Sequence, residues 1–98
     1  MIELDELKID GKSAVGIKVI MPDAPPLIMI RASKGVLFCG YLNPDAADNF
    51  GLAAAIVRGV STVDEALEKP VVHATKKAEE MGIKIGMSGR DALRLFLQ

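Results

Sequence analysis

The sequence predicts a small α+β domain with a mixed or antiparallel β-sheet, an N-terminal β-hairpin and about four short helices. Two alternating segments flank Asp10-Gly11, a pair whose tolerance of positive φ suits a two-residue hairpin turn. A long apolar run lies near the middle of the chain, and helix-capping patterns recur in its second half. The 98 residues suffice for one core, so we expect a single domain over residues 1–98.

The first two strands are expected to pair across Asp10-Gly11. With these two residues as the loop, Ile9 pairs with Lys12 and Ile2 pairs with Val19. One face of the hairpin is then apolar, and it carries Ile2, Leu4, Val15, Ile17 and Val19. The opposite face is only partly polar, so the hairpin needs cover on both sides.

Residues 1–32 are therefore expected to form an N-terminal β region used for oligomerisation, with residues 33–98 forming the rest of the domain. Half of the residues are apolar, which is more than one small core comfortably hides. Part of this apolar surface is expected in a subunit interface. The predicted interface residues are Leu4, Val15, Ile17 and Val19.

Two further strands are expected after the prolines at positions 22, 25 and 26 interrupt the sheet pattern. Residues 27–32 are apolar except for Arg31, and Ser33-Lys34-Gly35 suits a tight turn. Residues 36–42 are apolar at both parities, which is typical of a strand covered on both faces at the centre of a sheet.

The second half of the chain is expected to alternate between helices and short strands. Asn43 and Pro44 begin a helix that ends near Phe50. Residues 52–57 fit either a helix or a strand, and we favour a strand because Ile56-Val57 are β-branched.

The remaining elements are predicted from caps, proline and glycine. They are a helix over 63–69 capped at Thr62, a helix from Pro70 to Gly82, a strand over 83–86, and a last helix capped at Ser88. In the last helix, Leu93, Phe96 and Leu97 are expected to face inward.

Composition excludes several classes of protein. Twelve basic and thirteen acidic side chains leave a net charge of −1 without a basic stripe, so we expect no nucleic-acid partner. A single Cys forms no intramolecular disulfide and is typical of a reducing compartment. The acidic N-terminal residues resemble no signal peptide, and no apolar run is long enough to span a membrane. We therefore expect a cytoplasmic protein with no membrane partner.

Several segments together resemble the YunC-like family of small uncharacterised bacterial and archaeal proteins. The matching residues are LIMIRASKG from Leu27, CGYL from Cys39, AAIVRGVSTVDEAL from Ala54 and GIKIGMSGRDALRLF from Gly82. The resemblance implies an α+β domain whose N-terminal β region mediates tetramerisation. It brings no established catalytic residues, and it implies no cofactor.

Few residues offer chemistry. Cys39 and His73 are the candidate catalytic residues, although a buried free Cys and a lone His are more often structural. Ser88, Gly89 and Arg90 are candidates for binding an anion, because a helix start and a guanidinium both suit a phosphate or carboxylate. One His per chain and the absence of a calcium-loop pattern predict no metal site.

Two functions from different classes remain open from the sequence. The first is a homo-oligomer, expected to be a tetramer, that has a structural role or binds a small-molecule ligand. The alternative is an enzyme whose site lies between subunits and uses Cys39, Tyr41, His73 or Arg90. A subunit of a larger complex is a third class, and the sequence assigns no activity to any of them.

Overall fold

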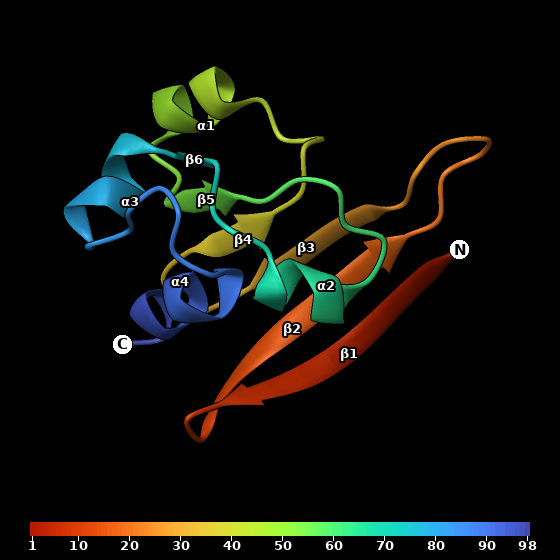
Figure 1. The fold of residues 1–98 in the computed structure, drawn as a ribbon, viewed down its shortest axis with the longest axis horizontal. Helices are drawn as coiled ribbons and strands as arrows, with labels where there is room; N and C mark the ends of the chain where they lie inside the picture. The colour runs from red at the N-terminus through yellow and green to blue at the C-terminus, as the bar shows by residue number, and fades with distance from the viewer.

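The computed structural model describes all 98 residues as one six-stranded mixed sheet with four helices (Figure 1). The strands lie in the order β1-β2-β3-β4-β5-β6, which follows the chain. They are β1 (Ile2–Ile9), β2 (Lys12–Val19), β3 (Leu27–Arg31), β4 (Val36–Phe38), β5 (Ala54–Ile56) and β6 (His73–Ala74). The helices are α1 (Pro44–Phe50), α2 (Val63–Glu68), α3 (Lys76–Glu80) and α4 (Gly89–Phe96). The predicted fold class is confirmed.

The N-terminal hairpin has the predicted register. Ile9 pairs with Lys12, Ile2 pairs with Val19, and all eight residues of each strand are paired. Asp10 and Gly11 have φ values of 52° and 80°, as a turn with two left-handed residues requires. The hairpin is therefore specified by local turn chemistry together with its alternating pattern.

Strand β4 is much shorter than the predicted strand over 36–42. It ends at Phe38, and the N–H of Leu42 donates to the carbonyl of Cys39 at 3.3 Å in a turn. This turn redirects the chain into α1, so the apolar residues after Phe38 are not in a strand. Strand β4 does lie inside the sheet, antiparallel to β3 and parallel to β5, which makes the sheet mixed.

The prediction of a helix from Pro70 to Gly82 is wrong for residues 70–75. Residues 71–75 are extended, because the N–H of Val72 donates to Ile56 at 2.8 Å and that of Thr75 to Ala54 at 3.0 Å. Part of this segment, β6, pairs with β5 on the side away from β4, and the helix begins only at Lys76, as α3. Pro70 instead forms a bridge with Ser88.

The strand predicted over 83–86 is also absent. Ile83 is buried, but Gly86 adopts φ 97° and its N–H donates to the carbonyl of Val71 at 2.8 Å. The segment is a pair of turns that returns the chain to α4.

The capping predictions hold. The side chains of Asn43, Thr62 and Ser88 accept hydrogen bonds from the first turns of α1, α2 and α4. Gly51 ends α1 with φ 74°, and residues 52–57 contain the favoured strand, β5. Leu93, Phe96 and Leu97 are buried, as the pattern of the last helix predicts.

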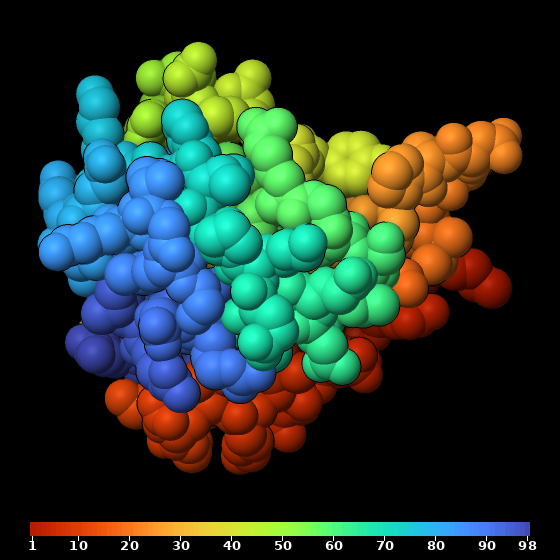
Figure 2. Space-filling model, in the orientation of Figure 1, coloured from red at the N-terminus to blue at the C-terminus, as the bar shows by residue number.

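Helices α2 and α4 cover one face of the sheet. They pack on β2, β3 and β4, and together with buried strand residues they form the main core. Figure 2 shows this side as a continuous layer formed by the segments from α2 to α4 over the sheet, with the hairpin emerging below it. The core is centred on Ile28, Ile30, Leu37, Leu93 and Phe96, each at most 1% exposed.

The opposite face of β1, β2 and β3 has no such cover, and we call it the open face. Its apolar residues, which share one side of the sheet through the observed pairing, are Ile2, Leu4, Val15, Ile17, Val19, Leu27 and Met29. Glu6 and Arg31 lie on the same face, on either side of Val15. Ile2 and Leu4 are 67% and 66% exposed. At the β5 end the same face is closed, because Ala54 and Ile56 are fully buried where α1 lies (Figure 1).

Candidate functional site

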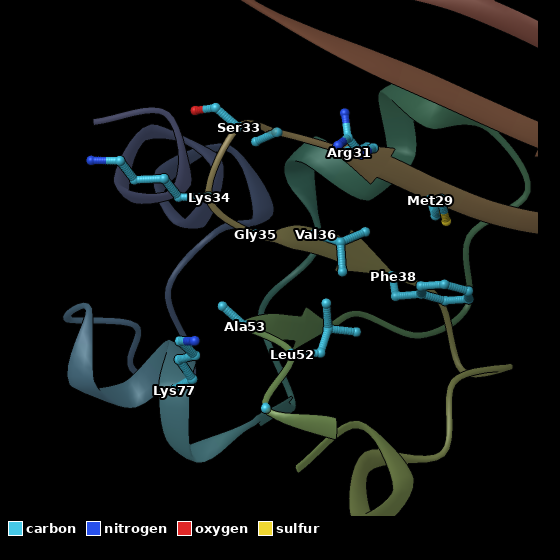
Figure 3. A pocket seen from close by; sticks show the side chains of 12 residues that line it. Met29, Arg31, Ser33, Lys34, Gly35, Val36, Phe38, Leu52, Ala53 and Lys77 are labelled. Carbon is cyan, nitrogen blue, oxygen red and sulfur yellow. The ribbon is translucent and has the colours of Figure 1, made fainter. Parts of the chain in front are cut away.

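A hollow of about 410 Å³ lies where the open face meets the β3–β4 turn, and we call it the Arg31 hollow (Figure 3). Its volume is within the range of small-molecule sites. Its apolar side chains come from the ends of β3 and β4 and from the segment after α1. The lining consists of Met29, Arg31, Ala32, Ser33, Lys34, Gly35, Val36, Phe38, Gly51, Leu52, Ala53 and Lys77.

Packing from the helix side shapes the turn in this hollow. A Cβ at Gly35 would overlap the ring of Phe96, which is completely buried. The N–H of Lys34 donates to the carbonyl of Phe96 at 3.0 Å, so α4 holds the turn from behind. Position 35 therefore requires glycine, because the backbone there lies against Phe96. On either side of this turn, Arg31 and Val36 are cross-strand partners.

The charges in the Arg31 hollow are all of one sign. Arg31, Lys34 and Lys77 line it, and no acidic residue does. The ion pairs of the chain involve only Arg90 and Arg94, so these three cations are unpaired. Figure 3 shows Arg31 and Lys77 on opposite sides of Val36 and Leu52, with Lys34 pointing outward.

A second hollow of about 360 Å³ lies beside the β2–β3 loop, and we call it the Cys39 hollow. Its lining consists of Pro25, Pro26, Cys39, Gly40, Tyr41, Arg58, Gly59 and Val60. The Sγ of Cys39 accepts a hydrogen bond from the N–H of Ile28 at 3.3 Å, and the hydroxyl of Tyr41 donates to the carbonyl of Pro25 at 2.6 Å. Arg58 makes no ion pair.

A third hollow, on the helix side of β1, is mainly acidic. It is lined by Glu3, Asp5, Glu6, Leu7, Lys18, Thr62, Val63 and Asp64. No three His, Cys, Asp or Glu side chains in the structure lie close enough together to hold a metal ion. None of the helices is long and apolar enough to cross a membrane.

Comparison with known proteins decides the family. Residues 38–96 match a family described as a domain of unknown function, DUF1805. The chain belongs to the DUF1805 family. Its resemblance to YunC-like proteins is confirmed by a relative in Bacillus subtilis, the uncharacterized protein YunC. The two sequences are 32% identical over 97 residues, which cover 95% of each chain.

Two further proteins are similar to this DUF1805 chain. A crystal structure of a protein of unknown function from Thermoplasma acidophilum, TA1206, is 34% identical with a TM-score of 0.92, over 98% of this chain and 93% of that one. An oxygen-dependent choline dehydrogenase of Pseudomonas syringae pv. tomato is 30% identical over 96 residues, but this chain spans only 15% of its length. YunC and TA1206 are uncharacterised, so no activity is assignable from them.

The structure brings together some of the predicted residues of this DUF1805 chain. Cys39 and Tyr41 line one hollow, as an active site would require. His73 lies on β6, where it is exposed and paired with Ile56, rather than on a helix. Arg90 donates to Glu68 at 2.9 Å, and neither His73 nor Arg90 lines the Cys39 hollow.

The segment predicted to bind an anion has partners within the chain. The hydroxyl of Ser88 accepts from the N–H of Asp91 at 3.1 Å, and Arg90 is paired with Glu68. Gly89 is buried, and a Cβ there would overlap the carbonyl oxygen of Ala66. These groups hold α4 against α2.

Arg31, Arg58 and Lys77 were not predicted as site residues. For Arg31 a signal exists, because it is the sole charged residue in the apolar stretch from Leu27 to Ala32. Arg58 and Lys77 carry no such signal. They reach their hollows only because β5 and α3 are placed beside β4 and the β3–β4 turn by the tertiary fold.

Proposed function

We propose that this protein is a self-assembling, ligand-binding protein of the cytoplasm. Copies of the chain associate through the open face, in a homotetramer as the family resemblance implies, and the Arg31 hollow beside that face holds a small ligand. The observation that carries this proposal is that an uncovered apolar sheet face runs directly into a hollow. A single free cysteine favours the reducing cytoplasm.

The size of the open face supports association. Strands β1 and β2 have eight residues each and β3 has five. At ~3.3 Å per residue and ~4.8 Å per strand, these three strands cover roughly 330 Å². An apolar area of this extent is comparable to the largest patch on a typical monomer, and such patches are often functional. It would form the apolar centre of a standard interface, to which the surrounding residues would add a polar rim.

A second copy of the chain is the occupant that fits this face best. The exposed edge strand β1 carries three acidic residues, Glu3, Asp5 and Glu6, and like charges oppose pairing of two such edges. Association is therefore favoured through the flat apolar face, where identical patches meet about a two-fold axis. The resemblance to YunC-like proteins, which implies tetramerisation through the N-terminal β region, points to the same strands.

Leu4→Lys tests the assembly. Leu4 is 66% exposed within one chain, so the substitution leaves the fold intact but places a charge in the interface. We expect association to weaken by about 2 kcal/mol or more and the mass in solution to fall, measured by native mass spectrometry and light scattering.

Ile85→Lys is the matched control, because Ile85 is also exposed, at 59%, but lies outside the sheet. It should keep the wild-type mass. A folded Leu4→Lys protein of unchanged mass, or a wild-type protein that is monomeric at micromolar concentration, would contradict the assembly.

A second candidate function is an enzyme that uses the Cys39 hollow. The observation in its favour is that Cys39, Tyr41 and the unpaired Arg58 line one cavity. A cation near a thiol favours the reactive thiolate, and a partner subunit would have to supply a general base.

Thiol labelling tests this candidate. If the Cys39 hollow is an active site, iodoacetamide should alkylate native Cys39 faster than the same cysteine in the unfolded chain, and Arg58→Gln should slow the native reaction about tenfold. Mass spectrometry of timed samples measures both rates. Because Cys39 is only 5% exposed, a native rate far below the unfolded rate would identify it as a structural residue and remove the candidate.

A further inference from the structure

Taking the Arg31 hollow to be the ligand site of the proposed function, we propose that it binds small organic anions that have an acidic head and a short apolar body. The hollow combines an apolar surface with a positively charged one. Its floor is apolar, with Val36, Phe38 and Leu52 among its members, and its walls carry Arg31 and Lys77.

The position of Arg31 is the strongest argument for a negatively charged ligand. Arg31 stands on the open face of β3, with Val15 and Val36 as its cross-strand partners. The carboxylate in the same cross-strand row, Glu6, lies beyond Val15 and makes no ion pair. Arg31 is exposed and has no anionic partner in the chain, so its guanidinium is free to donate paired N–H groups to a carboxylate or phosphate in the hollow.

Lys77 is held on the other side of the hollow by the start of α3. The hydroxyl of Thr75 caps this helix, and the carboxylate of Asp48 accepts the N–H of Lys76 at 2.7 Å. Figure 3 shows Lys77 at the side of the hollow nearest Ala53, with Leu52 and Arg31 farther away. The two cations therefore flank the apolar floor, and an anion bound there would be near both.

The apolar floor excludes inorganic anions as the best ligands. Phosphate alone would leave Phe38 and Leu52, the floor residues that are not buried, in contact with water and would gain only from the charges. A ligand that also covers these side chains removes apolar surface from water. A fatty acid of about six carbons has the required acidic head and short apolar body, and it is small enough to enter a hollow of about 410 Å³.

The test compares hexanoate, hexanol and inorganic phosphate in titrations of ¹⁵N-labelled protein. We expect hexanoate to shift the amides of residues 33–35 and 51–53 saturably, with a Kd on the order of 1 to 10 mM. Hexanol and phosphate should each bind roughly three- to tenfold more weakly. The double variant R31Q/K77Q should weaken hexanoate by a similar factor and leave hexanol unchanged.

The matched control is K12Q/K84Q, which removes two exposed lysines that are not in the hollow. It should bind hexanoate like the wild type. The inference would be overturned if hexanol or phosphate bound the wild-type protein as tightly as hexanoate does. It would also be overturned if R31Q/K77Q bound hexanoate with the wild-type affinity. If hexanol binds saturably at the same amides, the hollow is still supported as a ligand site even where the preference for anions fails. The mass measurements on Leu4→Lys test the assembly separately, without any ligand.

Discussion

Two glycines set how closely α4 approaches the rest of the molecule. At Gly35 a side chain would enter the ring of Phe96. At Gly89 it would overlap the carbonyl oxygen of Ala66 and lie 2.8 Å from Leu37 Cδ2. Backbone oxygens in a helix do not move aside as a flexible side chain does, so the contact at Gly89 cannot be relieved cheaply.

Gly89→Ala should therefore lower the free energy of unfolding by about 2 to 4 kcal/mol, because it forces α2 and α4 apart. Urea denaturation followed by circular dichroism measures the change. Gly40→Ala is the control, since the nearest atom to its added Cβ is 3.8 Å away and its backbone is not in the left-handed region that disfavours alanine. It should change stability by less than about 0.5 kcal/mol, and equal losses in the two variants would refute the packing argument.

Single residues also show where sequence reasoning about the site succeeds and fails. Cys39 and Tyr41 are two residues apart, and the structure places both in one hollow. His73 was expected on a helix and lies on β6, because the hydrogen bonds of β5 capture its segment. Lys77 joins a site with Arg31, 46 residues earlier in the chain, and no local pattern connects them.

Helix starts are the elements that local sequence determines best. The hydroxyl of Thr62 accepts the N–H of Glu65 at 3.1 Å, and the carboxylate of Glu65 accepts the N–H of Ser61 at 2.8 Å. Both bonds form between residues at most four positions apart. They begin α2, whose buried Val63, Ala66 and Leu67 then pack in the core.

Thr62→Ala should cost about 1 kcal/mol of stability, because it removes the cap and leaves an unpaired N–H at the start of α2. Thermal and urea unfolding both report the loss. Ser61→Ala provides a close control, since Ser61 contributes its backbone N–H and its hydroxyl makes no hydrogen bond. A loss in Ser61→Ala as large as that in Thr62→Ala would show that the cap is not the source of the stability.

The segment from Pro70 to Ser88 shows the opposite case. Its periodicity is compatible with a helix, but its first residues are extended because the backbone groups of Ile56 and Ala54 need partners at the edge of β5. The hydrogen bond from Val71 to Met87 at 2.7 Å then folds the segment back on itself. These partners are distant in sequence, so no local propensity reveals them.

At the scale of the whole molecule, one face of the sheet is covered by helices, and the opposite face is open over β1, β2 and β3. The proposed assembly would remove Ile2, Leu4 and Val15 from water, and their contact with water is costly for an isolated chain. The Leu4→Lys comparison has a second readout at this scale. If assembly stabilises the fold, the wild-type unfolding temperature should rise with protein concentration, and that of Leu4→Lys should not.

By itself the sequence determined the α+β class, the register of the N-terminal hairpin and the starts of α1, α2 and α4. These features depend on alternation, on the two left-handed residues Asp10 and Gly11, and on side-chain caps, all of which act within a few residues. Only the tertiary structure decided that β4 ends at Phe38, that residues 71–75 are extended, and that Arg31 and Lys77 share a hollow. The physical reason is that these features depend on hydrogen bonds and packing between segments brought together by the fold, and their energies outweigh local preference.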